Sequence, residues 1–74
     1  MNQTLTEHFF SKQRSTELPF VIGDTVRVLR GDYEGKIGRV DLLDTSKNTP
    51  QFLVDFKDGT DELIEHDNLE LIQL

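Results

Sequence analysis

Alternating hydrophobic and polar residues mark the clearest strand in the first half of the chain, residues 25–29. Val26 and Val28 alternate with Thr, Arg and Leu neighbours, and a period of two places both valines on one face of a half-buried strand. Gly31 and Gly35 then bracket a short polar stretch. The pattern predicts a strand that ends in a tight loop.

A returning strand is predicted over residues 36–43. Val40 and Leu42 share a face with Gly38, whose missing side chain lets the strand bend sharply or another strand approach closely. Ile37 breaks the strict alternation. A bulge near Gly38 is therefore expected to bring both Ile37 and Val40 into the core.

The second half of the chain predicts a hairpin. Residues 51–56 alternate cleanly and should place three large side chains on one face, namely Phe52, Val54 and Phe56. The pair Asp58-Gly59 is favoured at hairpin turns that need positive φ, and residues 60–65 return as a strand. Leu63 and Ile64 are adjacent, so only one of them can follow the alternation inward.

Residues 66–68 predict a single tight helical turn, and a short last strand over residues 69–72 is expected to pair with the first. Residues 20–74 thus predict five antiparallel strands closed into a small barrel. The expected core consists of Val26, Val28, Val40, Phe52, Val54 and Phe56. Pro19 biases the residue before it to an extended conformation and marks the expected domain boundary.

The first part of the chain, residues 1–19, is polar and lacks strand alternation, which predicts a flexible tail. Its spacing also permits a short helix over residues 5–13, but an isolated helix shorter than ~12 residues is marginal in water. Two roles stay open for Phe9 and Phe10, either covering an open end of the barrel or anchoring a partner. On composition, deleting residues 1–16 should leave the thermal melt nearly unchanged.

The glycine and valine pattern of the first hairpin resembles the KOW motif of certain ribosomal proteins and transcription elongation factors. The matching positions are Gly23, Asp24, Val26, Val28, Gly31, Gly35, Gly38 and Val40. The resemblance implies an all-β, SH3-like barrel that contacts RNA or a ribonucleoprotein. Glu34 stands where the motif usually has a basic residue, which removes a charge expected to meet phosphate. A weaker similarity to Tudor-like barrels implies methyl-lysine binding, but the chain has no Trp for an aromatic cage.

Charge opposes a nucleic-acid partner over most of the chain. The 74 residues carry 8 basic and 14 acidic side chains, a net charge of −6, whereas non-specific nucleic-acid affinity comes from neutralised phosphates. Residues 20–40 hold four basic and three acidic side chains, and residues 41–74 hold two basic and nine acidic ones. An anionic partner would therefore have to approach the first hairpin. The acidic half is explained by solubility or by an acidic docking face.

Sequence features argue against an enzyme, a cofactor or a metal. The chain has no cysteine and no phosphate-binding glycine loop, and its two histidines, His8 and His66, lack metal-ligand spacing. A barrel of this size is filled by its own side chains and lacks room for a ~300 Å³ pocket. Without an apolar run of roughly 20 residues or a secretory signal pattern, we expect a cytoplasmic protein with no membrane contact.

Contact residues are expected around the first hairpin and in the tail. Tyr33 lies in the predicted loop between charged residues, where it either meets a partner or half-packs at the barrel mouth. Four basic side chains could share one patch beside it, namely Arg27, Arg30, Lys36 and Arg39. Alternatively they pair with the nearby carboxylates of Asp24, Asp32, Glu34 and Asp41. The candidate partner contacts are Tyr33, Arg27, Arg30, Lys36, Arg39, Phe9 and Phe10.

Two functions follow from these observations. The charge balance and Glu34 favour a non-enzymatic binding module that docks onto a protein, or within a larger assembly, through its loops. The resemblance favours a KOW-type contact with RNA or the ribosome through residues 23–40.

Overall fold

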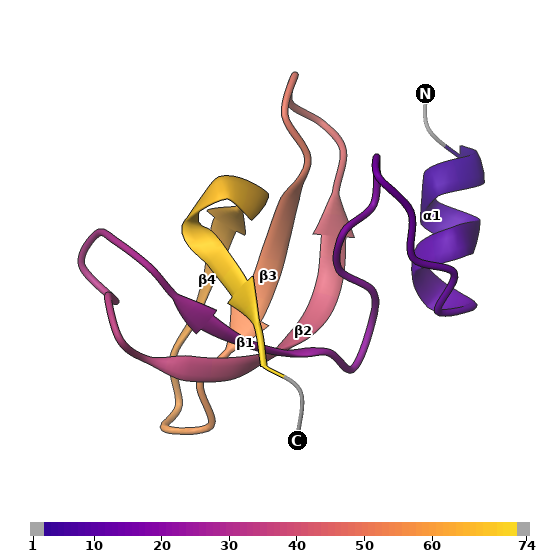
Figure 1. Cartoon of the computed structure of the whole chain (residues 1–74). Coiled ribbons are helices and arrows are strands. Elements are labelled where there is room, and N and C mark those ends of the chain that lie inside the picture. The colour runs from indigo at the N-terminus through magenta and orange to yellow at the C-terminus, as the bar shows by residue number, and fades with distance from the viewer. Residues whose placement is uncertain (1–2, 73–74) are drawn as a thin grey trace.

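The computed structural model describes residues 3–72 and is almost entirely β-structure (Figure 1). Its elements in chain order are helix α1 (Gln3–Phe10), strands β1 (Thr25–Val28), β2 (Ile37–Asp44), β3 (Gln51–Asp55) and β4 (Asp61–Glu65), the 3₁₀ turn η1 (His66–Asn68) and strand β5 (Leu69–Leu71). The predicted strands, the tight turn after β4 and the short N-terminal helix are all present.

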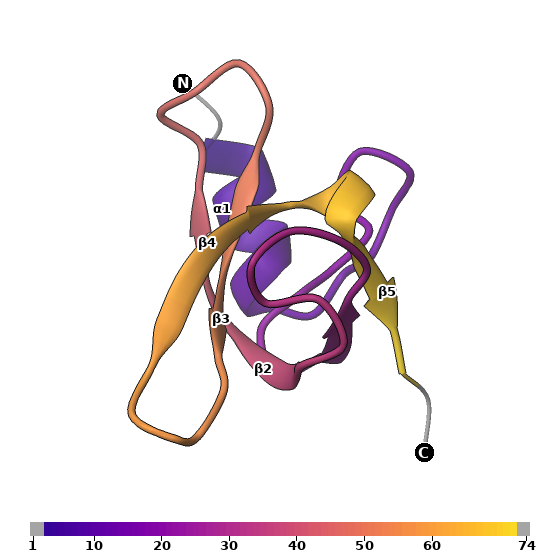
Figure 2. The ribbon, with the colours of Figure 1, turned by 90° about the vertical axis from the view of Figure 1, so that its left-hand side faces the viewer.

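The five strands form one antiparallel sheet in the order β4-β3-β2-β1-β5. As predicted, the last strand pairs with the first, with Val28 opposite Leu69. Within residues 3–72 no strand pair joins β4 to β5, so the sheet is curved but does not close into a complete barrel. Figure 2 shows β4 continuing through η1 into β5, which lies across the molecule from it.

The long strand β2 contains a bulge, between Val40 and Leu42 rather than near Gly38. The bulge reverses which residues of β2 face the core: even-numbered residues do so before it and odd-numbered residues after it. Val40 is fully buried before it, whereas Leu42 is 46% exposed after it and Leu43 pairs with Phe52. The expectation that Ile37 reaches the core is wrong, since its side chain is 50% exposed.

Gly38 allows β3 to approach β2 closely, as its place in the strand predicted. A Cβ atom at this position would lie 2.6 Å from the carbonyl oxygen of Asp55 and 2.7 Å from Cγ1 of Val54. Real Cβ atoms do not come so near other heavy atoms, so any larger residue would push the strands apart.

The core contains all six predicted residues. Val26, Val28, Val40, Phe52, Val54 and Phe56 are each buried. They are joined by Phe9, Leu18, Phe20, Val21, Ile64 and Leu69. Of the adjacent pair in β4, Ile64 faces inward and Leu63 is 40% exposed, so one of the two follows the alternation as expected.

The N-terminal segment packs on the sheet, which differs from the flexible tail expected from its composition. Phe9 and Leu18 are both 0% exposed, and the Phe9 ring lies 6.3 Å from that of Phe52. The amide of Ile22 donates to the carbonyl of Phe9 at 3.3 Å, which ties α1 to the segment before β1. Composition could not show this, because Phe9 is the one fully buried side chain among residues 5–10.

Helix α1 ends at Phe10 in a defined cap, three residues before the end predicted at residue 13. Lys12 adopts a left-handed conformation with φ of 63°. The amide of Gln13 donates to the carbonyl of His8 at 2.8 Å, and that of Lys12 to Phe9 at 3.3 Å. These two bonds form a Schellman motif, which stops α1 and turns the chain back toward the sheet.

Candidate interaction site

The loop between β1 and β2 is held in one conformation by its own backbone. The amide of Gly35 donates to the carbonyl of Val28 at 2.8 Å, and the amide of Val28 to the carbonyl of Lys36 at 2.9 Å. Gly31 and Gly35 have φ of 96° and 87°, a region that side chains other than glycine rarely adopt. The backbone of the β1–β2 loop therefore has a defined conformation, which sets the positions of its side chains.

Tyr33 is half-buried and packs on the curved sheet. Its ring stacks on Phe56, with centroids 5.2 Å apart and planes at 13°. The ammonium nitrogen of Lys36 sits 5.7 Å from the Tyr33 centroid and 5.5 Å from that of Phe56. Tyr33 is thus half-buried, as one of the two alternatives predicted, and its contact with a partner stays a prediction. Sequence reasoning missed Phe56 as its support, since Phe56 was expected only in the core.

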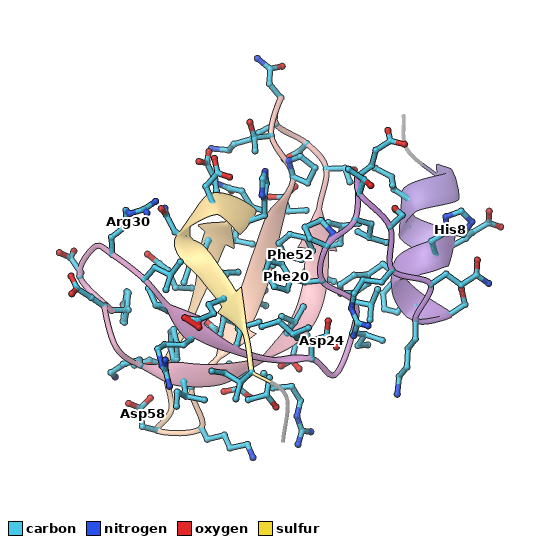
Figure 3. All side chains as sticks on the ribbon, viewed as in Figure 1. His8, Phe20, Asp24, Arg30, Phe52 and Asp58 are labelled. Carbon is cyan, nitrogen blue, oxygen red and sulfur yellow. The ribbon has the colours of Figure 1, made fainter. Side chains whose placement is uncertain are left out.

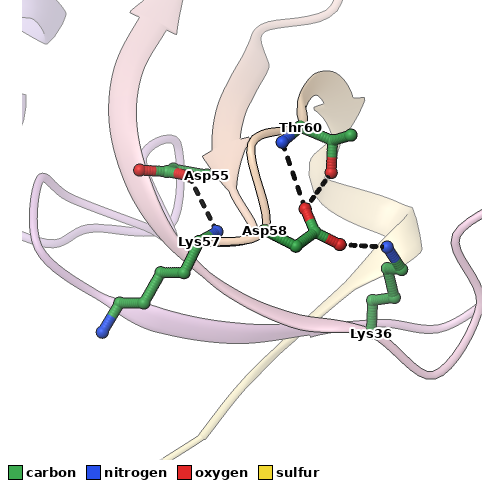
Figure 4. A network of polar contacts seen from close by, with 5 residues as sticks. All are labelled: Lys36, Asp55, Lys57, Asp58 and Thr60. Carbon is green, nitrogen blue, oxygen red and sulfur yellow. Dashed lines mark hydrogen bonds and ion pairs between the residues drawn. The ribbon is translucent and has the colours of Figure 1, made fainter.

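Lys36 is bound by a carboxylate from the turn between β3 and β4 (Figure 4). Its Nζ lies 2.8 Å from Oδ2 of Asp58, and both groups are substantially exposed. Asp58 also accepts hydrogen bonds from the hydroxyl and the amide of Thr60. The Lys36 ammonium and then the Thr60 donors lower the pKa of Asp58 well below its usual value. The positive charge of Lys36 is therefore paired inside the molecule.

Arg30 links the same loop to η1. Its guanidinium donates to Oδ1 of Asn68 at 2.8 Å and to the carbonyl of Asp67 at 3.1 Å. Both acceptors are uncharged, so this arginine is positioned but its charge is not neutralised by them. Figure 3 shows Arg30 and Asp58 at well-separated points of the surface. Arg30 and Lys36 thus leave the loop in different directions.

Arg27 and Arg39 lie on the outer face of the sheet, as strict alternation predicted. Arg27 pairs with Ile37 across β1 and β2, and Thr25 pairs with Arg39, so the two arginines are diagonal neighbours. Arg27 lies 3.8 Å from Glu70, and Arg39 stands opposite Asp55 in the sheet. The four basic residues therefore do not form one compact patch.

The carboxylates expected to pair with these basic residues are not the ones that do. The expected partners were Asp24, Asp32, Glu34 and Asp41, whereas the ion pairs of Arg27 and Lys36 are made by Glu70 and Asp58. Asp24 instead binds Arg14 at 2.6 Å and accepts from the amide of Val21. The expectation failed because it used neighbours in sequence, whereas strand pairing sets Glu70 beside Arg27 and the β3–β4 turn sets Asp58 beside Lys36.

A groove of about 260 Å³ runs between the β1–β2 loop and β4. Its apolar lining comes from Val28, Leu63 and Ile64, and its polar walls come from Arg30, Asp32, Tyr33, Gln51, Glu62, Glu65 and Asn68. Its size falls just below that of typical small-molecule sites, in line with the expectation from the size of the domain. An open groove of this kind fits a chain segment better than an enclosed ligand.

Other candidates in the described part of the chain carry little chemistry. Residues 3–72 contain no group of three His, Cys, Asp or Glu side chains that could hold a metal ion. His8 points away from the sheet on α1 (Figure 3), while His66 belongs to η1. Phe10 is 52% exposed beside the buried Phe9, so of the two rings it is the one that a partner can reach. The described helices are too short or too polar to span a bilayer.

Comparison with known proteins identifies the first hairpin. Residues 22–52 match the KOW motif, which confirms the resemblance seen in the sequence. The match covers β1, β2, the loop between them and the start of β3. No curated protein and no solved structure matches the chain. The KOW motif indicates a small binding module, often in RNA or ribosomal settings.

Proposed function

With residues 22–52 taken as a KOW motif, we propose that the protein is a non-enzymatic binding module that docks onto another protein, alone or within a larger assembly. The contact is made by the β1–β2 loop around Tyr33, with Phe10 as a second anchor. The half-buried Tyr33 ring on a fixed loop offers contact area to a partner at low entropic cost. The net charge of −6 favours a protein surface over a polyanion.

The observation that carries this proposal is the ion pair between Lys36 and Asp58. The Lys36 ammonium lies 5.7 Å from the centre of the Tyr33 ring and is held at 2.8 Å by the carboxylate. Exposed ion pairs of this kind contribute little to stability, so the pair does not lock the loop. The Asp58 carboxylate does, however, offset the positive charge of Lys36 that would attract a phosphate.

RNA is the second candidate, and a specific observation favours it. Arg30 binds only uncharged acceptors, and Arg39 forms no ion pair with any of the residues 3–72. Lys36 is paired with Asp58 at 2.8 Å, and Arg27 lies at the longer distance of 3.8 Å from Glu70. Of the four basic residues in the first hairpin, at most three are therefore available to phosphates, namely Arg30, Arg39 and Arg27. Three contacts would give a slope of log affinity against log salt of about −2 to −3.

Titration of labelled single- and double-stranded RNA separates the two functions. At low salt, about 50 mM, we expect no binding tighter than ~100 µM. Saturable micromolar binding that Arg30→Glu and Arg39→Glu abolish would overturn the proposal in favour of RNA. In parallel, partners captured from RNase-treated extract should be retained by the parent and lost by Tyr33→Ala, with folding of the variant verified by circular dichroism.

A further inference from the structure

Three leucines form an exposed row across the outer face of the sheet. Leu42 of β2 pairs with Leu53 of β3, and Leu53 pairs with Leu63 of β4. Leu42 is 46% exposed and Leu63 is 40% exposed, while Leu53 between them is half-buried. The bulge in β2 creates this row, because it turns Leu42 outward in register with the other two.

Charged residues border the leucine row on both sides. One neighbouring row of the outer face is Arg39, Asp55 and Asp61, and the other is Asp44, Gln51 and Glu65. Four of these six side chains are acidic and one is basic. An apolar stripe inside an acidic border is complementary to a segment with apolar residues flanked by Lys or Arg.

Strand β4, at one end of this row, is an edge of the sheet. The amide of Phe56 donates to the carbonyl of Thr60 at 3.1 Å, so these two residues form a hydrogen-bonded pair. Hydrogen-bonded pairs alternate along an antiparallel ladder, so Glu62 and Ile64 direct their backbone groups to β3. The amides and carbonyls of Asp61, Leu63 and Glu65 point the other way, where residues 3–72 provide no strand.

The inner side of the same edge opens into the groove below the β1–β2 loop. Ile64 and the edge residue Leu63 both lie in its lining, and Asp32, Glu62 and Glu65 add negative charge there. A strand laid along β4 would therefore meet apolar and acidic groups on both of its faces. Its outward side chains would extend the leucine row, and its inward side chains would enter the groove.

We propose that the free edge of β4 binds a basic, extended segment of a partner protein as a sixth strand. An apolar residue of that segment lies beside Leu63, with Lys or Arg beside Asp61 and Glu65. A second apolar residue enters the groove against Ile64. This inference rests on the proposed function, because it specifies how a protein partner is recognised.

A second copy of the chain is the wrong occupant for this edge. Antiparallel pairing of two β4 strands about Leu63 would place Asp61 opposite Glu65 at both ends, and like charges directly opposite are destabilising. Acidic residues on an edge strand often serve only to prevent such pairing. That role alone does not require an exposed leucine between them, nor a groove behind the strand.

The test uses the full chain, labelled with nitrogen-15, and an acetylated, amidated peptide of sequence Thr-Lys-Val-Leu-Lys-Lys-Thr. Antiparallel to β4, this sequence sets its leucine beside Leu63 and lysines beside Glu65 and Asp61. We expect saturable binding with a Kd between about 10 and 200 µM, within the range of weak, transient contacts. Hydrogen exchange should slow at the amides of Asp61, Leu63 and Glu65 and change little at Glu62 and Ile64, which already bond to β3.

Two variants that each replace a partly exposed leucine of the row by lysine distinguish binding at the β4 edge from binding elsewhere on the row. Leu63→Lys should weaken peptide binding about tenfold or more. Leu42→Lys, on the same face but two strands away, should change it less than about twofold. The same peptide with Glu in place of each Lys should not bind.

Several results would overturn the inference. One is the absence of saturable peptide binding below ~1 mM; another is equal loss in the two variants. Protection at amides outside β4 would also refute the edge site. A protein partner captured equally by the parent and by Leu63→Lys would refute the edge site and leave the proposed function standing. Micromolar RNA binding, by contrast, would remove the proposed function itself.

Discussion

The burial of Phe9 gives a sharp prediction, because its neighbour Phe10 provides a control of the same side-chain type on the same helix. Phe9 is 0% exposed, and its ring contacts both the Phe52 ring at 6.3 Å and the Phe10 ring at 5.0 Å between centroids. Phe10 is 52% exposed. The variants Phe9→Ala and Phe10→Ala therefore remove one buried and one largely solvated ring.

The expected magnitudes differ widely. Truncation of a buried Phe to Ala costs about 3 to 5 kcal/mol. A chain of this length has a total stability of roughly 4 to 11 kcal/mol, so Phe9→Ala should leave the protein close to unfolding. Phe10→Ala loses part of an edge-to-face contact and little buried surface, about 1 kcal/mol or less.

Thermal melts followed by circular dichroism, with urea unfolding as a second measurement, test this expectation. At about 4 to 8 °C per kcal/mol, Phe9→Ala should lower Tm by roughly 12 to 40 °C and Phe10→Ala by less than ~8 °C. Deletion of residues 1–16 should match Phe9→Ala, in contrast to the expectation from composition. If the deletion and Phe9→Ala both melt like the parent, α1 does not pack on the sheet and the tail is separate.

Two further predictions concern the strands and the loop network. Gly38→Ala should destabilise the protein by about 2 to 3 kcal/mol, because the new Cβ would lie 2.6 Å from the Asp55 oxygen. Gly35→Ala is the control: its position has a positive φ but no heavy atom within 4 Å, so this variant should cost only about 1 kcal/mol. Equal losses of stability in urea unfolding would contradict the close approach at Gly38. Lys36 lowers the pKa of Asp58 in the folded state. The stabilisation by the ionised Asp58 carboxylate is therefore present above the unfolded pKa of ~4 and is lost as pH falls toward the folded value. The difference in Tm between the parent and Asp58→Asn should accordingly shrink from about pH 7 to pH 2. A difference that is constant or grows on acidification would show that the carboxylate is not paired.

Local patterns in the sequence determined most of the sheet. A period of two is set by the strand itself and does not depend on which strand lies next to it. Val26, Val28 and Val40 were therefore predicted inside, as were Phe52, Val54 and Phe56, and all six are buried. Gly38 was predicted at a close approach for a similarly local reason, since it lacks a Cβ. The KOW resemblance over the first hairpin likewise rests on residues near one another in sequence.

Features that depend on distant residues were decided only by the tertiary structure. The pairs of Lys36 with Asp58 and of Arg30 with Asn68 join residues 22 and 38 positions apart. Which carboxylate meets which cation depends on how the loops come together, and no spacing rule reports that.

The bulge in β2 and the docking of α1 have the same origin. A one-residue slip in pairing reverses the two faces of a strand, so the outward position of Leu42 depends on the partner strand and not on its own alternation. A helix as short as α1 is unstable alone, so its formation depends on the packing of Phe9 in the hydrophobic core. Sequence periodicity thus determined which residues form the strands, whereas packing between segments decided where the helix docks and which leucines face solvent.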